Sequence, residues 1–247
     1  MKRIGIIGGM SYRTTLFYYE QINRQINEAL GRLNSADLVI RSVNFEEYCE
    51  LMNQNQWKYV QEKLALRAKN LAYHSGCNYV AMATNTMHKF APEVKNRVEW
   101  LNYSCSSHPK FVHIGDCIAE KLKEVGAKRV MLLGTKYVIT DGFMKQFLSG
   151  RHNIDVVGMR DHYDEICEID RIISLELRHG IVEQESKAFI QRFIRDYYLY
   201  ASYKPEAIVL CSTELNALLK PGDTFHLPLI DSAQAHVDKL VKLSLSD

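Results

Sequence analysis

Small hydroxyl and amide side chains are grouped at two points of this 247-residue chain, each directly after a short apolar segment. The first group is Thr84-Asn85-Thr86, and the second is Ser212-Thr213-Glu214. Either group could simply cap the helix that follows it, because Ser, Thr and Asn side chains accept hydrogen bonds from free backbone N–H groups. Two such groups on opposite sides of a small ligand would instead suit a reaction that adds a proton on one face and removes it from the other.

A glycine-rich turn, Gly8-Gly9-Met10-Ser11, follows the first apolar segment. Glycine lets the backbone approach a ligand closely, and free N–H groups at the start of the next helix attract an anion. The spacing is not Gly-x-Gly-x-x-Gly, and no acidic residue ends a second strand, so a dinucleotide site is disfavoured. A tight turn that binds nothing is an equal alternative.

The elements that must position these groups alternate between short apolar runs and longer segments of helical period. Apolar residues recur at intervals of three and four in Trp57–Leu71, Ile166–Leu177 and Phe189–Tyr200, which predicts three buried helical faces. Strands that alternate with helices indicate an α/β fold of right-handed βαβ units on mainly parallel sheets. The predicted strands are Arg3–Ile7, Leu38–Val43, Tyr79–Ala83, Phe111–Ile114, Arg129–Leu133, Asp155–Gly158, Ala207–Cys211 and Pro228–Ile230.

Two of these strand sequences recur further along the chain at nearly one spacing. Arg3–Gly9 is similar to Arg129–Thr135 at an offset of 126, and Tyr79–Thr86 is similar to Ala207–Glu214 at an offset of 128. This repetition predicts an internal duplication, with two pseudo-symmetric α/β domains, each a mainly parallel sheet flanked by helices. A ligand cleft is expected between them, at the carboxyl ends of the strands.

The domain boundaries are predicted from two irregular stretches. The first domain is expected to hold residues 1–105 together with 223–247, and the second residues 106–222. The Pro- and Gly-containing turn at the second boundary is expected to return residues 228–245 to the first domain.

Composition excludes several classes of protein. Lys plus Arg number 31 and Asp plus Glu 29, so the formal charge of +2 gives no electrostatic case for a nucleic-acid partner. No apolar run reaches the ~18–20 residues that span a bilayer, and the N-terminal apolar stretch is too short for a signal peptide. We therefore expect a cytoplasmic protein without a membrane partner, with free thiols and, because no ligand cluster or Cys-x-x-Cys stands out, without a metal. The cysteines are Cys49, Cys77, Cys105, Cys117, Cys167 and Cys211.

Taken together, the motifs resemble those of the aspartate/glutamate racemase family. They are Gly8-Gly9-Met10-Ser11 with Thr15 and Tyr18-Tyr19, Thr84-Asn85-Thr86-Met87-His88-Lys89, His113-Ile114-x-Asp116, Leu132-Leu133-Gly134-Thr135 and Ser212-Thr213-Glu214. They occur in the family's order over almost the whole chain, with an insertion near residues 101–109. The resemblance implies a homodimer and racemisation of acidic amino acids without pyridoxal phosphate or another cofactor. Two groups, usually cysteines, exchange the α-proton from opposite faces.

The resemblance implies catalytic positions for Thr84 and Ser212, where cysteine is usual, although a subgroup of the family also has threonine at the first. The implied substrate-binding residues are Met10, Ser11, Thr15, Asn85, Thr86, Gly134, Thr135 and Thr213. A thiol with a pKa near ~8.5 supplies some thiolate at neutral pH, whereas an alcohol supplies almost none. Without a separate base, Thr84 and Ser212 are therefore expected to be poor proton carriers.

Two neighbouring features leave alternatives open. Side chains of a strand alternate between its faces, so Cys211 is expected in the core if Ser212 faces the ligand, unless a bulge reverses them. Where family members often have a lysine that pairs with a substrate carboxylate, this sequence has Glu168, with Arg171 one helical turn on. Because glutamate would repel a second carboxylate, either Arg171 takes over, or the ligand is not a dicarboxylate, or Glu168 is a solvated helix residue.

The sequence therefore favours a racemase-type isomerase that acts on a small amino acid or dicarboxylate. Replacement of both cysteines leaves two alternatives. The chain could bind its ligand without turnover, or it could be a related decarboxylase or isomerase that needs one competent acid, in which case Cys211 must reach the cleft. His88 and His113 could orient the ligand or a hydroxyl, although backbone contacts explain His113 better.

Overall fold

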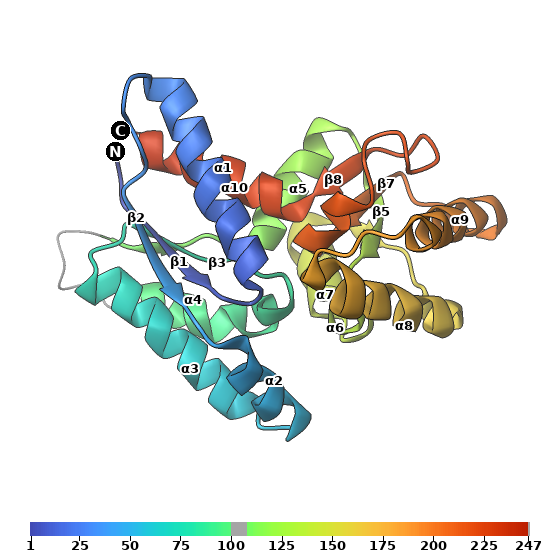
Figure 1. Ribbon diagram of the computed structural model, residues 1–247, viewed down its shortest axis with the longest axis horizontal. Coiled ribbons are helices and arrows are strands. Elements are labelled where there is room, and N and C mark those ends of the chain that lie inside the picture. Colours follow the sequence, from blue (N-terminus) through green and yellow to red (C-terminus); the bar gives the residue numbers. More distant parts are fainter. Residues whose placement is uncertain (100–107, 247) are drawn as a thin grey trace. The chain divides into compact units, whose positions relative to one another are not determined.

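The computed structural model describes residues 1–99 and 108–246, which fold into two compact units (Figure 1). Unit 1 comprises residues 1–113 and 236–247, and unit 2 comprises residues 114–235. The divisions after His113 and Ala235 lie further along the chain than the predicted divisions after residues 105 and 222. The prediction that Cys105 is a free thiol lies outside the described residues, whereas the other cysteines are free thiols.

Unit 1 is built on a parallel sheet whose described strands have the order β2-β1-β3-β4. The strands are β1 (Ile4–Gly8), β2 (Leu38–Ser42), β3 (Tyr79–Met82) and β4 (Lys110–Phe111). Every residue of β1 and β3 is buried, as expected for central strands that are covered on both faces. Ile4 pairs with Leu38 on one side and with Tyr79 on the other, so the carboxyl ends of these strands lie at one edge.

Helices cover both faces of this sheet, with α2, α3 and α4 on one face and α1 and α10 on the other (Figure 1). Side chains of α2, α3 and α4 pack with Val80 and Met82 in one core cluster. The predicted helical face is confirmed, because Val60, Leu64 and Ala68 are fully buried. The helices are α1 (Tyr12–Leu30), α2 (Phe45–Asn53), α3 (Trp57–Lys69), α4 (Ala91–Glu99) and α10 (Ser232–Leu245), with short turns η1 (Asn70–His74) and η2 (Thr86–Phe90).

Unit 2 repeats the topology of unit 1, with described strands in the order β6-β5-β7-β8. These are β5 (Arg129–Leu133), β6 (Asp155–Val156), β7 (Ala207–Leu210) and β8 (Leu229–Asp231). The strands that recur in the sequence, β1 with β5 and β3 with β7, are the two central strands of each sheet. The predicted fold class, an α/β protein of two similar parallel-sheet halves, is confirmed.

The two faces of the second sheet pack on different helices. The side chains of Ile208 and Leu210 join a cluster with α8 and α9, whereas those of Val209 and Cys211 join another with α5 and α7. Gly180 ends the helical segment after η5 and adopts a φ of +80°, a conformation typical of glycine at that position. The helices are α5 (Ile114–Glu124), α6 (Lys136–Thr140), α7 (Phe143–His152), α8 (Tyr163–Arg171) and α9 (Gln184–Tyr200), with short turns η3 (Arg160–His162), η4 (Ile172–Glu176), η5 (Leu177–His179) and η6 (Thr213–Ala217).

The first part of the predicted segment 228–245 lies in the sheet of unit 2, not in that of unit 1. Residues 228–245 were expected to return to the first half, but β8 pairs in parallel with β7, Ile208 opposite Leu229 and Leu210 opposite Asp231. β8 is thus the edge strand next to β7 in the sheet of unit 2. The chain passes from unit 2 to unit 1 only after Ala235, within α10. From His236 onward α10 belongs to unit 1, and Ser244 near its end accepts a hydrogen bond from the backbone of Lys2.

Candidate functional site

The end of β3 carries the first predicted group of polar residues. Asn85 is 6% exposed and precedes η2, yet its side chain makes no capping hydrogen bond. Thr84 and Thr86 are half-buried on either side of it. The carbonyl oxygen of Thr84 accepts a hydrogen bond of 2.7 Å from Nδ1 of the buried His88, which ties the strand end to the following turn. Helix capping by the side chain of Asn85 is therefore not what this group does.

A buried histidine cluster underlies this strand end. Nε2 of His236 lies 3.0 Å from the carbonyl oxygen of Val112 and must donate to it, so Nδ1 accepts a hydrogen bond of 2.9 Å from the Tyr18 hydroxyl. The rings of His88 and His113 meet edge to face at 4.7 Å. Burial lowers the pKa of His236 to about 4, and burial with the nearby His113 and His236 also lowers that of His88. His88 and His236 are therefore neutral at pH 7, and each donates a hydrogen bond to a backbone carbonyl oxygen, of Thr84 and of Val112 respectively.

The end of β7 separates two adjacent side chains with different chemistry. Cys211 is 2% exposed and belongs to the core cluster with α5 and α7. Ser212 keeps extended backbone, with φ −147° and ψ 124°, so strand alternation continues and no bulge reverses the two residues. Burial, reinforced by Asp231, raises the pKa of Cys211 to about 12. The expectation that Cys211 lies in the core is confirmed.

The Ser212 hydroxyl has a partner that the sequence analysis did not assign. Its Oγ donates a hydrogen bond of 2.8 Å to Oε2 of Glu214, and Ser212 itself is 7% exposed. Thr213, the next predicted site residue, is half-buried at the start of η6. The one signal in the sequence was the position of Glu214, two residues after a serine at the end of a predicted strand.

The turn after β1 is shaped by contacts within unit 1. Gly9 has a φ of +94°, and a Cβ there would lie 2.2 Å from the carbonyl oxygen of Val43. Oγ1 of Thr15 accepts a hydrogen bond of 2.7 Å from the N–H of Gly9 and donates one of 3.1 Å to the carbonyl oxygen of Ser11. Ser11 caps α1, since its Oγ accepts from the N–H of Thr14. Met10 is buried in the core, so these predicted binding residues also have structural roles.

The corresponding turn in unit 2 lies beside Ser212 along the sheet. The N–H of Cys211 donates to the carbonyl oxygen of Leu133, and a Cβ on Gly134 would lie 3.0 Å from Cβ of Cys211. Thr135 is 7% exposed and starts α6 without a side-chain capping bond. Unit 2 thus brings the predicted residues after β5 and β7 to one sheet edge, as unit 1 does for those after β1 and β3.

The predicted substrate contact on α8 is occupied by protein carboxylates. Arg171 donates two hydrogen bonds of 2.8 Å to the carboxylate of Glu168 and a third of 2.7 Å to Glu176. The hydrogen bonds to Arg171 hold the pKa of Glu168 below its usual range. Glu168 is therefore part of an ion-pair network, and Arg171 already has two acidic partners.

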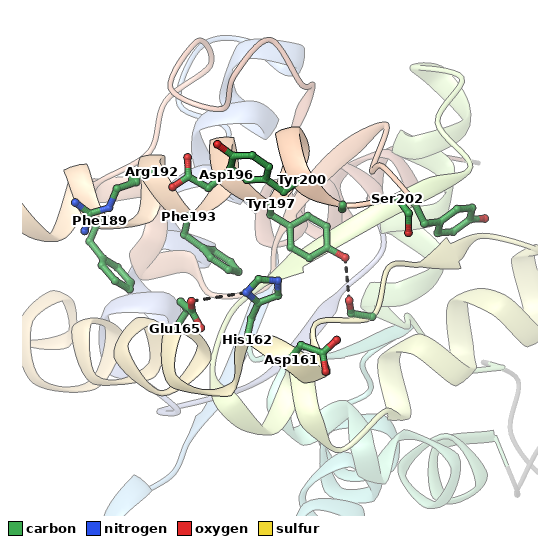
Figure 2. Close-up of a pocket in the computed structure, with 13 residues that line it drawn as sticks. Asp161, His162, Glu165, Phe189, Arg192, Phe193, Asp196, Tyr197, Tyr200 and Ser202 are labelled. Carbon is green, nitrogen blue, oxygen red and sulfur yellow. Dashed lines mark hydrogen bonds and ion pairs between the residues drawn. The ribbon is translucent and has the colours of Figure 1, made fainter.

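A cavity of about 630 Å³ lies elsewhere in unit 2, between the segment that follows β6 and the C-terminal half of α9 (Figure 2). The ring of His162 packs against those of Phe193 and Tyr197, with centroids 5.5 and 5.3 Å away. The Tyr197 hydroxyl donates a hydrogen bond of 2.8 Å to the carbonyl oxygen of Gly158. None of the predicted site residues lines this cavity, so the two strand ends remain the candidate site.

Two further features, a metal-binding cluster and a membrane-spanning helix, are absent from the residues that the structure describes. Within residues 1–99 and 108–246, no three or more His, Cys, Asp or Glu side chains gather in a way that could hold a metal ion. Over the same ranges, no helix combines the length and apolar character that crossing a membrane requires.

Solved structures share the fold over the full length of the chain. A candidate Asp/Glu racemase from Yersinia pestis superposes with a TM-score of 0.87 at 30% identity, and both chains are covered completely. An aspartate racemase homologue from Pyrococcus horikoshii gives 0.81 at 32% identity, again with complete coverage of both chains. The aspartate racemase of Picrophilus torridus gives 0.70 at 22% identity, with 99% of this chain and 94% of that chain covered, and so shows the fold alone.

The sequence itself gives the same assignment over nearly its whole length. A family model described as Asp/Glu/Hydantoin racemase matches residues 7–240, which include both groups of polar residues and both glycine-containing turns. With the two solved relatives at 30% identity or more, this match shows the family. The chain belongs to the Asp/Glu/Hydantoin racemase family.

Proposed function

We propose that this chain is a cofactor-independent, racemase-type isomerase that exchanges the α-proton of a small amino acid. In this proposal Thr84 and Ser212 occupy the two proton-transfer positions, one on each face of the α-carbon. Family membership supports the reaction class. Homodimerisation, which the family resemblance implies, is part of the same proposal and can be checked by light scattering.

The observation that carries the proposal is the equivalence of the two strand ends. β3 and β7 are the same strand of two sheets with the same topology, and each is followed by an alcohol and a short 3-10 turn. Thr84 follows the first and Ser212 the second. A reaction that removes a proton from one face of a carbon and returns it to the other needs two groups placed in this equivalent way.

Four side chains and one turn are proposed to bind the substrate. Asn85 and Thr135 are buried, and each directly precedes a helical turn at the carboxyl edge of its sheet. Thr86 and Thr213 begin the short turns after β3 and β7. The backbone of residues 10 and 11 adds N–H groups close to the start of α1, where an anion is stabilised, whereas the N–H of Gly9 donates to Thr15.

The identity of the substrate side chain is open to experiment. Because Glu168 and Glu176 already bind Arg171, this arginine gives no support for a second substrate carboxylate. Neutral amino acids therefore belong in the test together with aspartate and glutamate. If binding is strong only for the acidic pair, a cation other than Arg171 must hold the distal carboxylate.

The test is α-proton exchange in heavy water. Purified protein is incubated with aspartate, glutamate and a panel of neutral amino acids, and loss of the α-proton signal is followed by NMR. We expect loss for at least one amino acid, together with conversion between its enantiomers. Measurable binding with exchange at the background rate for every member would contradict turnover and leave a binding protein. Release of carbon dioxide from a malonate-type acid would favour a decarboxylase.

A further inference from the structure

The hydrogen bond between Ser212 and Glu214 changes what the serine can do. Oγ of Ser212 donates to Oε2 of Glu214 at 2.8 Å, a normal distance for an O–H···O⁻ bond. Ser212 is 7% exposed and Glu214 is half-buried, so water competes only partly for the pair. The contact lies wholly within unit 2 and does not depend on where unit 1 lies.

Local backbone geometry explains why residues two apart can meet. A regular strand would place the side chains of Ser212 and Glu214 on the same face, separated by two residue steps of about 3.3 Å each. Here the strand conformation ends at Ser212, and η6 begins at Thr213. Because the chain turns there, the spacing of a strand no longer applies, and the flexible side chain of Glu214 reaches Oγ of Ser212.

We infer that Glu214 is the proton acceptor that allows the Ser212 hydroxyl to work as a base at the α-carbon. This rests on the proposed function. Glu214 is a positioning residue in this scheme, because it acts through Ser212 and does not touch the substrate. An alcohol without a separate base is expected to be a poor proton carrier, and Glu214 supplies such a base to Ser212.

The proton-transfer step balances. The Cα–H bond breaks and its proton forms a new O–H bond with Oγ of Ser212, while the original Ser212 proton moves to Oε2 of Glu214. The electron pair that remains on the α-carbon delocalises into the substrate carboxylate. If the protons on Ser212 and Glu214 first exchange with water, delivery from Ser212 gives exchange with retention, whereas a proton delivered from the Thr84 side gives inversion. Glu214 then loses its proton to water and Thr84 regains one.

The Ser212→Cys substitution tests whether the Glu214 carboxylate activates Ser212 or only stabilises the structure. A thiol ionises near pH ~8.5 without help, so Ser212→Cys removes the need for a carboxylate partner. Glu214→Gln in the native background should lower α-proton exchange by about 100-fold or more, the range of general-base catalysis. In the Ser212→Cys background the same Glu214→Gln substitution should change exchange by less than about threefold.

The pH profile provides a second readout that a structural role would not move. Exchange by the native protein should depend little on pH from about 6 to 9, because neither proposed proton-transfer position carries a thiol. Exchange by Ser212→Cys should rise with pH as the thiol ionises. Glu214→Asp should retain part of the native rate if its shorter carboxylate still reaches Oγ.

Ser186 and Glu176 offer a matched control in the same unit. Ser186 is 6% exposed, and its Oγ donates to Oε2 of Glu176 at 2.6 Å, so the contact is of the same kind at a site without a proposed role. Ser186→Ala removes this hydrogen bond without breaking the ion pair between Glu176 and Arg171, and it should leave exchange within about twofold of native. Thermal unfolding of all variants identifies any that fails to fold.

The outcomes distinguish this inference from the proposed function. Full exchange by Glu214→Gln, or an equal loss in the native and Ser212→Cys backgrounds, would overturn the role of Glu214 and leave the racemase proposal intact. Exchange by Ser212→Cys alone, with an inert native protein, would show the site to be correctly placed but the serine inactive. If native protein and Ser212→Cys are both inert towards the whole panel, both proposals fail.

Discussion

At the scale of single residues, the chemistry after β7 depends on which of two adjacent side chains leaves the core. Cys211 packs against α5 and α7, whereas Ser212 carries its hydroxyl to Glu214. Burial raises the pKa of Cys211 to about 12, so its sulfur is a protonated, solvent-excluded thiol at neutral pH. The presence of a cysteine directly before Ser212 therefore does not supply a reactive thiol at this strand end.

The buried thiol gives a direct labelling prediction. Cys211 should resist alkylation by iodoacetamide at pH 8 in the folded protein, because only an accessible thiolate reacts. The half-exposed Cys49 and Cys167 should react under the same conditions and serve as internal controls. Peptide mass spectrometry measures all three, and urea-unfolded protein gives full labelling. Alkylation of Cys211 at the rate of Cys167 would show that the sulfur reaches solvent and reopen its catalytic use.

At the scale of elements, the turn after β1 owes its glycines to packing within unit 1. The Cβ position of Gly9 overlaps the backbone of Val43 after β2, and that of Gly8 lies 2.6 Å from the side chain of Thr15. The sequence suggested that glycine here lets a ligand or a tight turn approach the backbone. In the structure, the segments that approach these glycines closely are the protein's own residues Val43 and Thr15. A ligand can still use the N–H groups of this turn, but its glycines are required without one.

A pair of glycine substitutions separates steric overlap from backbone conformation. Gly9 and Gly222 have φ of +94° and +98°, but a Cβ on Gly222 would meet nothing within 4 Å. Gly222→Ala should cost about 1–2 kcal/mol for the left-handed conformation. Gly9→Ala should cost about 3 kcal/mol or more, because overlap with Val43 adds to that conformational cost. Urea unfolding measures both, and equal losses would show that the turn relaxes freely.

The packing of α10 on unit 1 depends on a histidine that must stay neutral. His236 is fully buried between the Tyr18 hydroxyl and the Val112 carbonyl, and burial lowers its pKa to about 4. An unfolded chain protonates histidine near pH 6.5. Between these values only the unfolded chain binds the proton, so stability present above pH 6.5 is lost as the pH falls toward 4.

The resulting loss is measurable by urea unfolding at pH 7 and pH 4.5. A shift of this size corresponds to about 3 kcal/mol once both forms have titrated. His236→Gln can still donate to Val112 and accept from Tyr18, and it should remove most of this pH dependence. The lowered pKa of His88 leaves a residual loss in the same direction. His74→Gln, at an exposed site, is the control. Equal losses in native protein and His236→Gln would contradict the assignment.

At the scale of the whole molecule, the sequence predicted what is periodic or repeated and missed what depends on distant partners. The recurrence of β1 in β5 and of β3 in β7 sufficed to predict two halves of like topology. The assignment of β8 failed because strand pairing with β7 leaves no local signal in the segment itself. The contacts of Glu214 and Arg171 were not predicted for another reason, because their partners are near in sequence but are selected by local side-chain geometry.

The duplication itself leads to a prediction about both halves. If β3 and β7 place Thr84 and Ser212 on opposite faces of one α-carbon, a thiol at either position should be able to exchange the proton on its own face. Thr84→Cys and Ser212→Cys should each raise exchange, and the double variant should also raise interconversion of enantiomers, by about tenfold or more, since both faces then have a group that ionises near neutral pH.

Exchange and inversion are to be measured separately, by NMR and by chiral chromatography. A single thiol should favour exchange with retention, because the proton returns from the group that removed it, and only the double variant should bring the two rates close together. Adding Cys211→Ala to the double variant should change neither rate, since that side chain lies in the core. A double variant that folds and binds an amino acid but shows no exchange would mean that the two strand ends do not act on one carbon.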